Sequence, residues 1–398
     1  SICDESFEPI DNPSIEEIER VFTSLSHEDW SYFVLGVTPS IAHNVFIQIG
    51  TNTDKDGDKE IQNYVIETRF EMDGIFKQYQ IYLEDKSTIL SILKEYLAGQ
   101  LPDLSGRRDI TEPIIANLIE ERLGKKGIRY TRSEEEELTS IFHYIRSNLD
   151  SDGKLPENFS IQSLYFKSEN EIGFVDGLVD RFLTGSVSPD TLYQVLELAS
   201  KEQYDEAFSL AHEYFKDNTE VRARFVSTEV QTWIINKKDV SAHALIFFAS
   251  RLIMETKNIE VLKFGLLILL RYELGEEIAF EYLMMVPALC DEFTLFSLSV
   301  ISNWKQRNGI VFSIAKRTYG WGRINAVREL IPETEEIRQW LLHEGCKNSI
   351  MPQYTAYDVA TKLNVAEMLQ SEQLDYDTFS GISHIVDALL DSYGGGPS

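Results

Sequence analysis

Two segments place oxygen-bearing side chains at spacings that resemble a calcium-binding loop. The first contains Asn52, Asp54, Asp56, Gly57 and Glu60, which match positions 1, 3, 5, 6 and 9 of such a loop. The second contains Asn148, Asp150, Asp152 and Gly153. A calcium loop closes on a bidentate Glu, but Asn63 and Phe159 stand at the closing positions here. Because Asp and Gly at these spacings are also typical of turns, the sequence predicts turns and no metal site.

Several common catalytic and cofactor-binding motifs are missing from the sequence. The seven histidines form neither His-Glu-x-x-His nor Glu-x-x-His, the patterns of zinc enzymes and di-iron bundles. The sequence has no Gly-x-x-x-x-Gly-Lys-Ser/Thr phosphate loop and no Gly-x-Ser-x-Gly nucleophile elbow. Gly320-Trp321-Gly322 is a lone Gly-x-Gly, with Asn325 where a dinucleotide-binding loop would have its third glycine. We therefore predict no catalytic residue and no cofactor.

One basic segment stands out in an acidic chain. Residues 301–328 contain no Asp or Glu and six basic residues, with aromatic residues among them. The candidate partner-binding residues are Trp304, Lys305, Arg307, Lys316, Arg317, Tyr319, Trp321, Arg323 and Arg328. Arginine forks and aromatic anchors would suit a groove for an acidic or phosphorylated partner. Two alternatives remain open: a dock for the acidic N-terminal domain of the same chain, or solvated surface with the tryptophans packed between helices.

The rest of the charge is acidic and unevenly spread. The 398 residues include 65 Asp and Glu against 37 Lys and Arg, a formal net charge of −28. Residues 1–110 hold 21 acidic and 9 basic residues, and residues 367–398 hold six acidic and no basic residues. This acidity argues against nucleic acid and anionic membranes as partners, because both attract clustered Lys and Arg. With 43% hydrophobic residues, the chain has ample material for packed cores.

Cysteine usage and hydropathy indicate a cytoplasmic protein. Cys3, Cys290 and Cys346 are far apart, so a disulfide framework and a zinc ribbon are not expected. No basic and apolar N-terminal signal is visible. The apolar run Phe264–Leu270 is far shorter than the roughly 20 residues of a membrane span.

The elements that would position these side chains change character near residue 110. Before it, the pattern predicts a small α+β domain: a helix, a four-stranded antiparallel sheet and a second helix. Ser14 and Glu17 form a capping box before the first helix, and the last helix covers Ser87–Leu97. The strands are predicted at Tyr32–Val37, Val45–Ile49, Tyr64–Phe70 and Phe76–Leu83.

Beyond residue 110 the predicted structure is mainly helical. Residues 111–185 read as a mixed connecting segment, with an extended piece at Ile161–Phe166. Residues 186–398 read as a helical domain with breaks that recur about every 15–20 residues. This spacing favours a HEAT-like α-solenoid, and an irregular helical bundle is the alternative.

Three N-terminal segments carry a resemblance to a known group of proteins: Pro13–Glu19, Tyr64–Phe70 and Tyr79–Tyr82. With the order of elements, they make residues 1–110 resemble the small α+β domain of immunity proteins from bacterial polymorphic toxin systems. The resemblance implies a protein that binds and blocks a cognate toxin, commonly a basic one, through an acidic face. In the C-terminal part, Gly320–Leu330 and Ile337–Cys346 are similar to HEAT-like helical proteins of bacilli, some of them labelled limonene hydroxylase.

These patterns favour a non-enzymatic protein–protein interaction protein. We expect an immunity or inhibitor protein that occludes a basic toxin domain, because opposite charges steer association. The alternative is a monooxygenase of the limonene-hydroxylase-labelled family, which the missing cofactor motifs disfavour. The oligomeric state stays open.

Overall fold

The computed structural model describes residues 2–4, 10–27, 31–56, 59–72, 74–101, 106–130, 139–161, 188–216, 222–237, 239–348, 350–371 and 373–390. The chain divides into two compact units, Ser1–Ile115 and Ala116–Ser398. This division lies five residues after the predicted boundary at residue 110. The second predicted boundary, between residues 185 and 186, lies outside the described residues, as does most of the predicted extended piece Ile161–Phe166.

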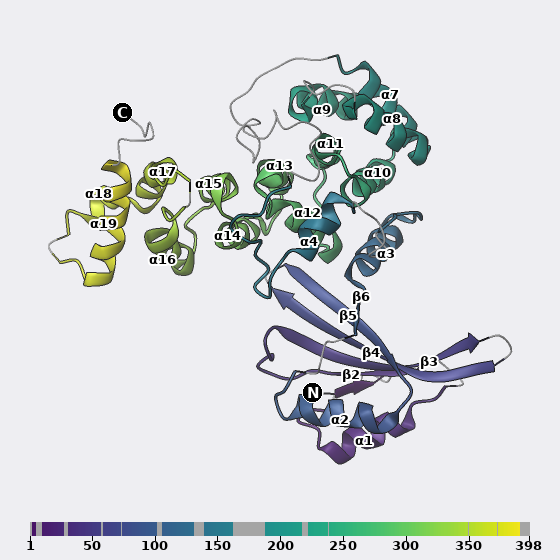
Figure 1. Ribbon diagram of the computed structural model, residues 1–398. Helices are drawn as coiled ribbons and strands as arrows, with labels where there is room; N and C mark the ends of the chain where they lie inside the picture. Colours follow the sequence, from purple (N-terminus) through teal and green to yellow (C-terminus); the bar gives the residue numbers. More distant parts are fainter. Residues whose placement is uncertain are drawn as a thin grey trace. The chain divides into compact units, whose positions relative to one another are not determined.

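The first unit contains an antiparallel sheet with the strand order β1-β2-β3-β4-β5-β6 (Figure 1). The strands are β1 (Ile2–Asp4), β2 (Tyr32–Leu35), β3 (Asn44–Asp56), β4 (Lys59–Met72), β5 (Ile75–Leu83) and β6 (Arg108–Asp109). The prediction of four strands was wrong by two, since β1 and β6 are added at the edges of the sheet. With three and two residues, these strands are too short to show the alternation of apolar and polar residues that identifies a strand. They are held by pairing to β2 and β5.

Two helices, α1 (Ile15–Ser24) and α2 (Lys86–Leu97), cover one face of this sheet (Figure 1). The predicted capping box is confirmed: Ser14 Oγ accepts the N–H of Glu17, and the Glu17 carboxylate accepts the N–H of Ser14. Ile18 and Phe22 of α1 pack with Leu93 of α2 in the core.

Tyr96 attaches α2 to the sheet. Its hydroxyl donates a hydrogen bond of 2.6 Å to Asn44 Oδ1 on β3, and its side chain is fully buried. Burial raises the pKa of Tyr96 to about 12. The helices and the sheet therefore form one layer each around a shared apolar core, as an α+β fold requires.

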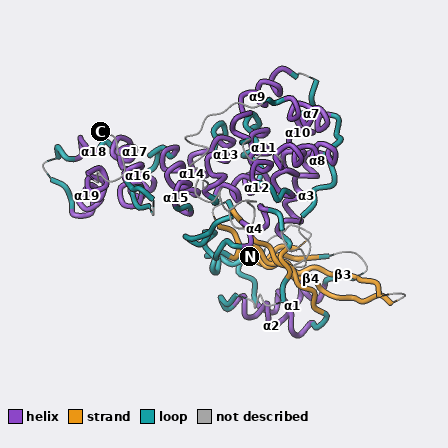
Figure 2. The backbone as a smooth tube through the Cα atoms, turned by 45° about the horizontal axis from the view of Figure 1, so that its top comes forward, coloured by secondary structure: helices purple, strands orange, loops and turns teal. Residues whose placement is uncertain are grey.

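The second unit is helical throughout its described elements (Figure 2). Its helices are α3 (Thr111–Leu123, which begins in the first unit), α4 (Ile141–Ser147), α7 (Asp190–Ser200), α8 (Tyr204–Lys216), the 3-10 turn η2 (Ala223–Val226), α9 (Ser227–Asn236), α10 (Ala242–Glu255), α11 (Ile259–Leu269), α12 (Ile278–Ala288), α13 (Asp291–Ile301), α14 (Arg307–Arg317), α15 (Gly320–Glu329), α16 (Glu335–Glu344), α17 (Gln353–Leu363), α18 (Val365–Met368) and α19 (Tyr376–Leu390). The predicted order of an α+β part followed by a helical part is confirmed. None of the described helices is long and apolar enough to cross a membrane.

Helices of the second unit pack with their next-but-one neighbours as well as with adjacent helices. The odd-numbered helices α11, α13, α15, α17 and α19 contact one another in that order. The even-numbered helices α10, α12 and α14 do the same. Adjacent helices such as α10 and α11, or α14 and α15, connect the two rows. Helices α10 to α15 thus form two rows that pack against each other.

Candidate functional site

The tryptophans of the basic segment lie inside the helical unit. Trp304 is 3% exposed, and its Nε1 donates to the carbonyl of Tyr272 at 3.3 Å. Gly275 lies so close to the indole that a Cβ there would overlap it. Trp321 is also buried and meets Tyr354 edge to face, with ring centroids 5.5 Å apart. Both indoles therefore contribute packing between helices.

Three cations of the segment form ion pairs with acids elsewhere in the unit. Lys305, an exposed residue, pairs with Glu276. Arg307 pairs with Glu329 at the end of α15. Arg328 Nε lies 2.8 Å from Asp358 Oδ2 on α17. These three charges are thus compensated by acids outside residues 301–328.

The remaining members of the set are largely buried. Arg317 donates from Nε to the carbonyl of Ser313 at 3.2 Å. Arg323 donates from Nη2 to the carbonyl of Glu344 at 2.8 Å and lies 5.0 Å from the centre of the Trp340 ring, and burial lowers the pKa of this guanidinium. Lys316 lies over the ring of Phe312 at 4.5 Å. The nine predicted residues lie on α14, α15 and the loops beside them, with Lys305 exposed and the others half-buried or buried. Their role in partner binding stays a prediction.

The Gly320-Trp321-Gly322 motif binds an anion that belongs to the chain itself. It begins α15, and the N–H groups of Trp321 and Gly322 each donate to the Asp291 carboxylate at 3.0 Å. A Cβ at Gly320 or Gly322 would overlap this carboxylate, and Gly320 has a positive φ of 54°. The motif resembles a phosphate-binding turn because its backbone N–H groups bind an anion at the N-terminus of a helix, with the Asp291 carboxylate in place of a phosphate.

The two calcium-like segments are turns or strands in the structure. Asp150 Oδ1 accepts the N–H groups of Asp152 and Lys154 at 2.9 and 2.8 Å, which is an Asx turn. Strand β3 contains Asn52, Asp54 and Asp56, and it pairs with β4 as far as the residue pair Asp56–Lys59. Within the described parts of the chain, no group of three His, Cys, Asp or Glu side chains is placed to hold a metal ion.

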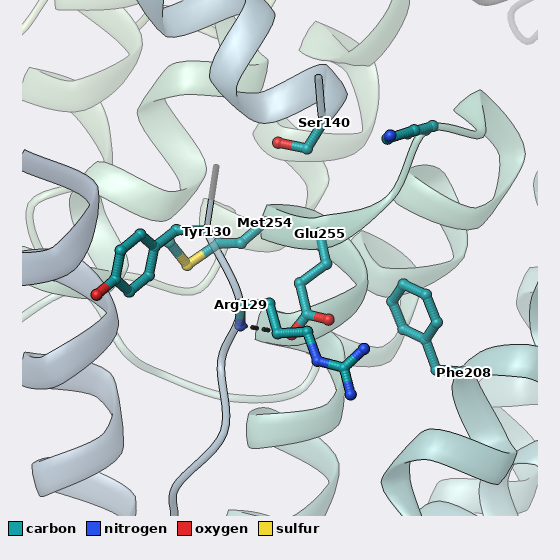
Figure 3. A pocket seen from close by; sticks show the side chains of 7 residues that line it. Arg129, Tyr130, Ser140, Phe208, Met254 and Glu255 are labelled. Atoms are coloured by element: carbon teal, nitrogen blue, oxygen red, sulfur yellow. Dashed lines mark hydrogen bonds between the residues drawn. The ribbon is translucent and has the colours of Figure 1, made fainter. Parts of the chain in front are cut away.

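Figure 3 shows a pocket of about 220 Å³ beside the C-terminal end of α10. The Glu255 carboxylate accepts the N–H of Arg129 at 3.0 Å and is held by Arg251 through two contacts of 2.7 and 3.1 Å. Phe208 of α8 lines the side of the pocket. This volume is below the roughly 300–1,000 Å³ of small-molecule sites. Glu255 therefore fastens the segment before α4 to α10, a structural task.

A second pocket, of about 380 Å³, lies among η2, α13 and α15. Arg224 and Arg328 contribute guanidinium groups, Leu295 and Leu298 contribute apolar surface, and Asn325 is buried nearby. Arg224 Nη1 is buried without a hydrogen-bond partner among the described residues. Two guanidinium groups could bind a carboxylate or phosphate here. The sequence pointed to Arg328 but not to Arg224, which is distant in the chain.

The β3–β4 hairpin extends beyond the rest of the sheet (Figure 1). β2 pairs with β3 up to Gly50, and β5 pairs with β4 from Tyr64 onward. Residues 51–56 and 59–63 consequently pair with each other and with no third strand of the described sheet. We call these two stretches, with the two residues that connect them, the hairpin arm.

Hydrogen bonds fix the base of the hairpin arm. Thr51 Oγ1 donates to the carbonyl of Ser26 at 2.8 Å and accepts the N–H of Ser31 at 3.1 Å. Asn52 Nδ2 donates to Asn63 Oδ1 at 2.8 Å across the two strands. The arm therefore leaves the sheet in a defined direction.

Sequence reasoning expected a loop where the hairpin arm lies. The predicted strands ended at Ile49 and began again at Tyr64, because the residues between them, apart from Ile61, are polar or glycine and do not alternate with apolar ones. The one signal for the arm is Asp56-Gly57, a dipeptide that favours tight hairpin turns.

The buried thiol of Cys346 gives a simple test of the C-terminal helices. Cys346 is 8% exposed, and burial raises the pKa of its thiol to about 12. Because the thiolate is the nucleophile, we expect iodoacetamide at about pH 8 to leave Cys346 unmodified in the folded protein and to modify it in concentrated guanidinium. Peptide mass spectrometry measures both. Rapid modification in the folded protein would contradict this packing.

Comparisons with known proteins found no counterpart: no protein-family model, no curated protein and no solved structure matches this chain.

Proposed function

We propose that this protein is a non-enzymatic binding protein whose acidic N-terminal unit engages a basic protein partner, in the manner of an immunity or inhibitor protein that blocks a toxin. The single observation that carries the proposal is the hairpin arm. It projects from the sheet. Beyond its base, where Thr51 bonds to Ser31 and Asn63 contacts His27, its two edges carry backbone groups that no other described strand satisfies. Such a ribbon offers a partner both main-chain pairing and an element to insert.

The charge of the hairpin arm supports a basic partner. The sequence of the arm contains Asp54, Asp56, Asp58 and Glu60 against Lys55 and Lys59. The whole of residues 1–110 carries 21 acidic and 9 basic residues. Opposite fields raise the rate of association and select partners of the opposite sign. A basic cleft that must be occluded is therefore the surface that the arm fits best.

The energetics of the hairpin arm support the same view. A two-stranded ribbon without a third strand is marginally stable by itself. Charged residues along an unpaired edge discourage random strand pairing between copies. An extended arm of this kind costs stability unless a partner contributes contacts to it, which is the expectation for a binding element.

The helical unit is proposed to serve as a HEAT-like solenoid scaffold. In support, α11, α13, α15, α17 and α19 contact one another in sequence order, and adjacent helices join them to a second row. Repeat scaffolds of this kind present extended surfaces to proteins.

The proposal is tested with a capture experiment that compares three forms of the full chain at low salt. The arm variant is Asp54→Asn, Asp56→Asn and Glu60→Gln. The control variant removes the same number of charges from exposed acids of the helical unit: Asp152→Asn, Glu157→Gln and Glu213→Gln. We expect a basic protein to be retained by the wild type and the control and to be reduced at least about ten-fold on the arm variant.

The captured protein must also behave as the proposal requires. Its expression in bacteria should be toxic, and co-expression of the wild-type chain, but not of the arm variant, should suppress the toxicity. Equal capture by the arm variant and the control, or the recovery of no basic protein, would contradict the proposal.

A further inference from the structure

Helix α19 presents an apolar stripe to solvent. Tyr376, Phe379 and Leu390 are 86%, 55% and 73% exposed, and Val386 is half-buried. Together with Ser383, which lies between Phe379 and Val386, these residues are separated by 3, 4, 3 and 4 positions along the helix. Side chains at this spacing share one face of a helix, and it is the spacing of a seam between two helices. We call these positions the α19 stripe.

The α19 stripe lies on a helix that is held firmly by its other side. Ile382 and Ile385 are buried, and α19 packs against α16 and α17. Gly381 approaches Leu342 of α16 so closely that a Cβ would overlap it. Asp375 accepts the N–H of Thr378 at 2.8 Å and so caps the start of the helix. The stripe is thus displayed by a positioned helix, which reduces the ordering cost of binding.

The surroundings of the α19 stripe are acidic. Glu367, Asp375, Asp377 and Asp387 are exposed, and residues 367–398 contain no Lys or Arg. Asp387 borders the stripe, three residues before Leu390 and four after Ser383. A second copy of this chain would bring the same acids against them, and like charges across a helix pair are unfavourable. The complementary occupant is a helix with an apolar stripe and basic flanks.

We propose that the α19 stripe is a docking site for a basic amphipathic helix of a partner protein. The partner helix lays its apolar side chains along Tyr376, Phe379 and Leu390, and its Lys or Arg residues face Asp387. This surface is separate from the hairpin arm and does not rest on the function proposed above.

The test uses a synthetic peptide and the full chain. The peptide has about 20 residues, with leucines at heptad spacing and lysines at most other positions. A matched peptide carries glutamate in place of each lysine. Fluorescence anisotropy at low salt measures the dissociation constants. We expect the lysine peptide to bind, the glutamate peptide not to bind, and the variant Phe379→Ser with Leu390→Ser to weaken binding at least about ten-fold.

Two controls separate docking from general attraction to an acidic protein. The variant Ile235→Ser with Ile278→Ser removes two other exposed apolar side chains, 55% and 46% exposed, and should bind the lysine peptide as the wild type does. The arm variant should bind the lysine peptide as tightly as the wild type does. A failure of the function proposed for the hairpin arm would therefore leave the test of the α19 stripe unaffected. The melting temperature of each variant checks that it is folded.

Three outcomes would overturn the inference. Equal binding of the lysine peptide to the Phe379→Ser, Leu390→Ser variant would show that the stripe takes no part. Equal binding of the glutamate peptide would remove the charge argument. Sedimentation that finds a dimer of the wild type and a monomer of this variant would identify a second copy as the occupant.

Discussion

Replacing Lys263 with alanine is expected to lower the free energy of unfolding of the helical unit by about 3–5 kcal/mol. Lys263 lies on α11 and is 1% exposed. Its ammonium group contacts the carboxylate of Glu260 at 3.1 Å and pairs with Glu292 of α13, itself 2% exposed. Removal of the ammonium would leave the Glu292 carboxylate buried without this cation, and the desolvation of that charge would no longer be offset.

Urea unfolding followed by tryptophan fluorescence measures this effect, because four of the five tryptophans belong to the helical unit. Lys201→Ala is the control. Lys201 forms an exposed pair with Glu197 at 3.4 Å, so its loss should cost no more than about 0.5 kcal/mol. The double variant Lys263→Met with Glu292→Leu should recover most of the loss, since it removes the buried cation together with Glu292, while Glu260 keeps its ion pair with Arg222 at 3.2 Å. Equal midpoints for Lys263→Ala and Lys201→Ala would contradict this account of the core.

Replacing Asp291 with alanine is expected to destabilise the helical unit by about 3 kcal/mol, from two charge-assisted hydrogen bonds and the dipole of α15. The carboxylate accepts the N–H groups of Trp321 and Gly322, and its removal would leave both donors without this acceptor. Gly320→Ala should also destabilise the unit, because its Cβ would overlap Asp291 and its φ of 54° disfavours a side chain.

The same unfolding measurement tests the α15 cap. Thr334→Ala removes an ordinary N-cap, in which Thr334 Oγ1 accepts the N–H of Ile337 at 3.2 Å, and should cost about 1 kcal/mol. Asp291→Asn keeps a hydrogen-bond acceptor, so its loss of unfolding free energy should fall between those of Thr334→Ala and Asp291→Ala. An Asp291→Ala variant no less stable than Thr334→Ala would show that the carboxylate does not hold α15 in place.

Local signals in the sequence predicted the helices well. Ser14 with Glu17 identifies the start of α1, because the Ser14 side chain accepts a backbone N–H group in the first turn. The predicted helix Ser87–Leu97 agrees with α2, which begins one residue earlier, at Lys86. Apolar periodicity and caps act over a few residues, so they can be read without knowledge of the fold.

Features that depend on distant partners could not be predicted. Lys305 and Arg328 pair with Glu276 and Asp358, about 30 residues away in each direction, so the composition of residues 301–328 did not reveal how its charges are compensated. The hairpin arm was missed for a related reason. Its strands are defined by pairing with each other, whereas their own residues lack the apolar alternation of a half-buried strand.

Hydrogen exchange of the backbone amides in the full chain, alone and with the basic protein that it captures, tests the central claim most directly. The account predicts that the amides of residues 52–56 and 59–62 that lie on the unpaired edges of the hairpin arm exchange rapidly in the free chain and become protected in the complex. Protection that appears elsewhere in the chain while the arm continues to exchange as it does in the free protein would contradict the claim that the arm is the binding element.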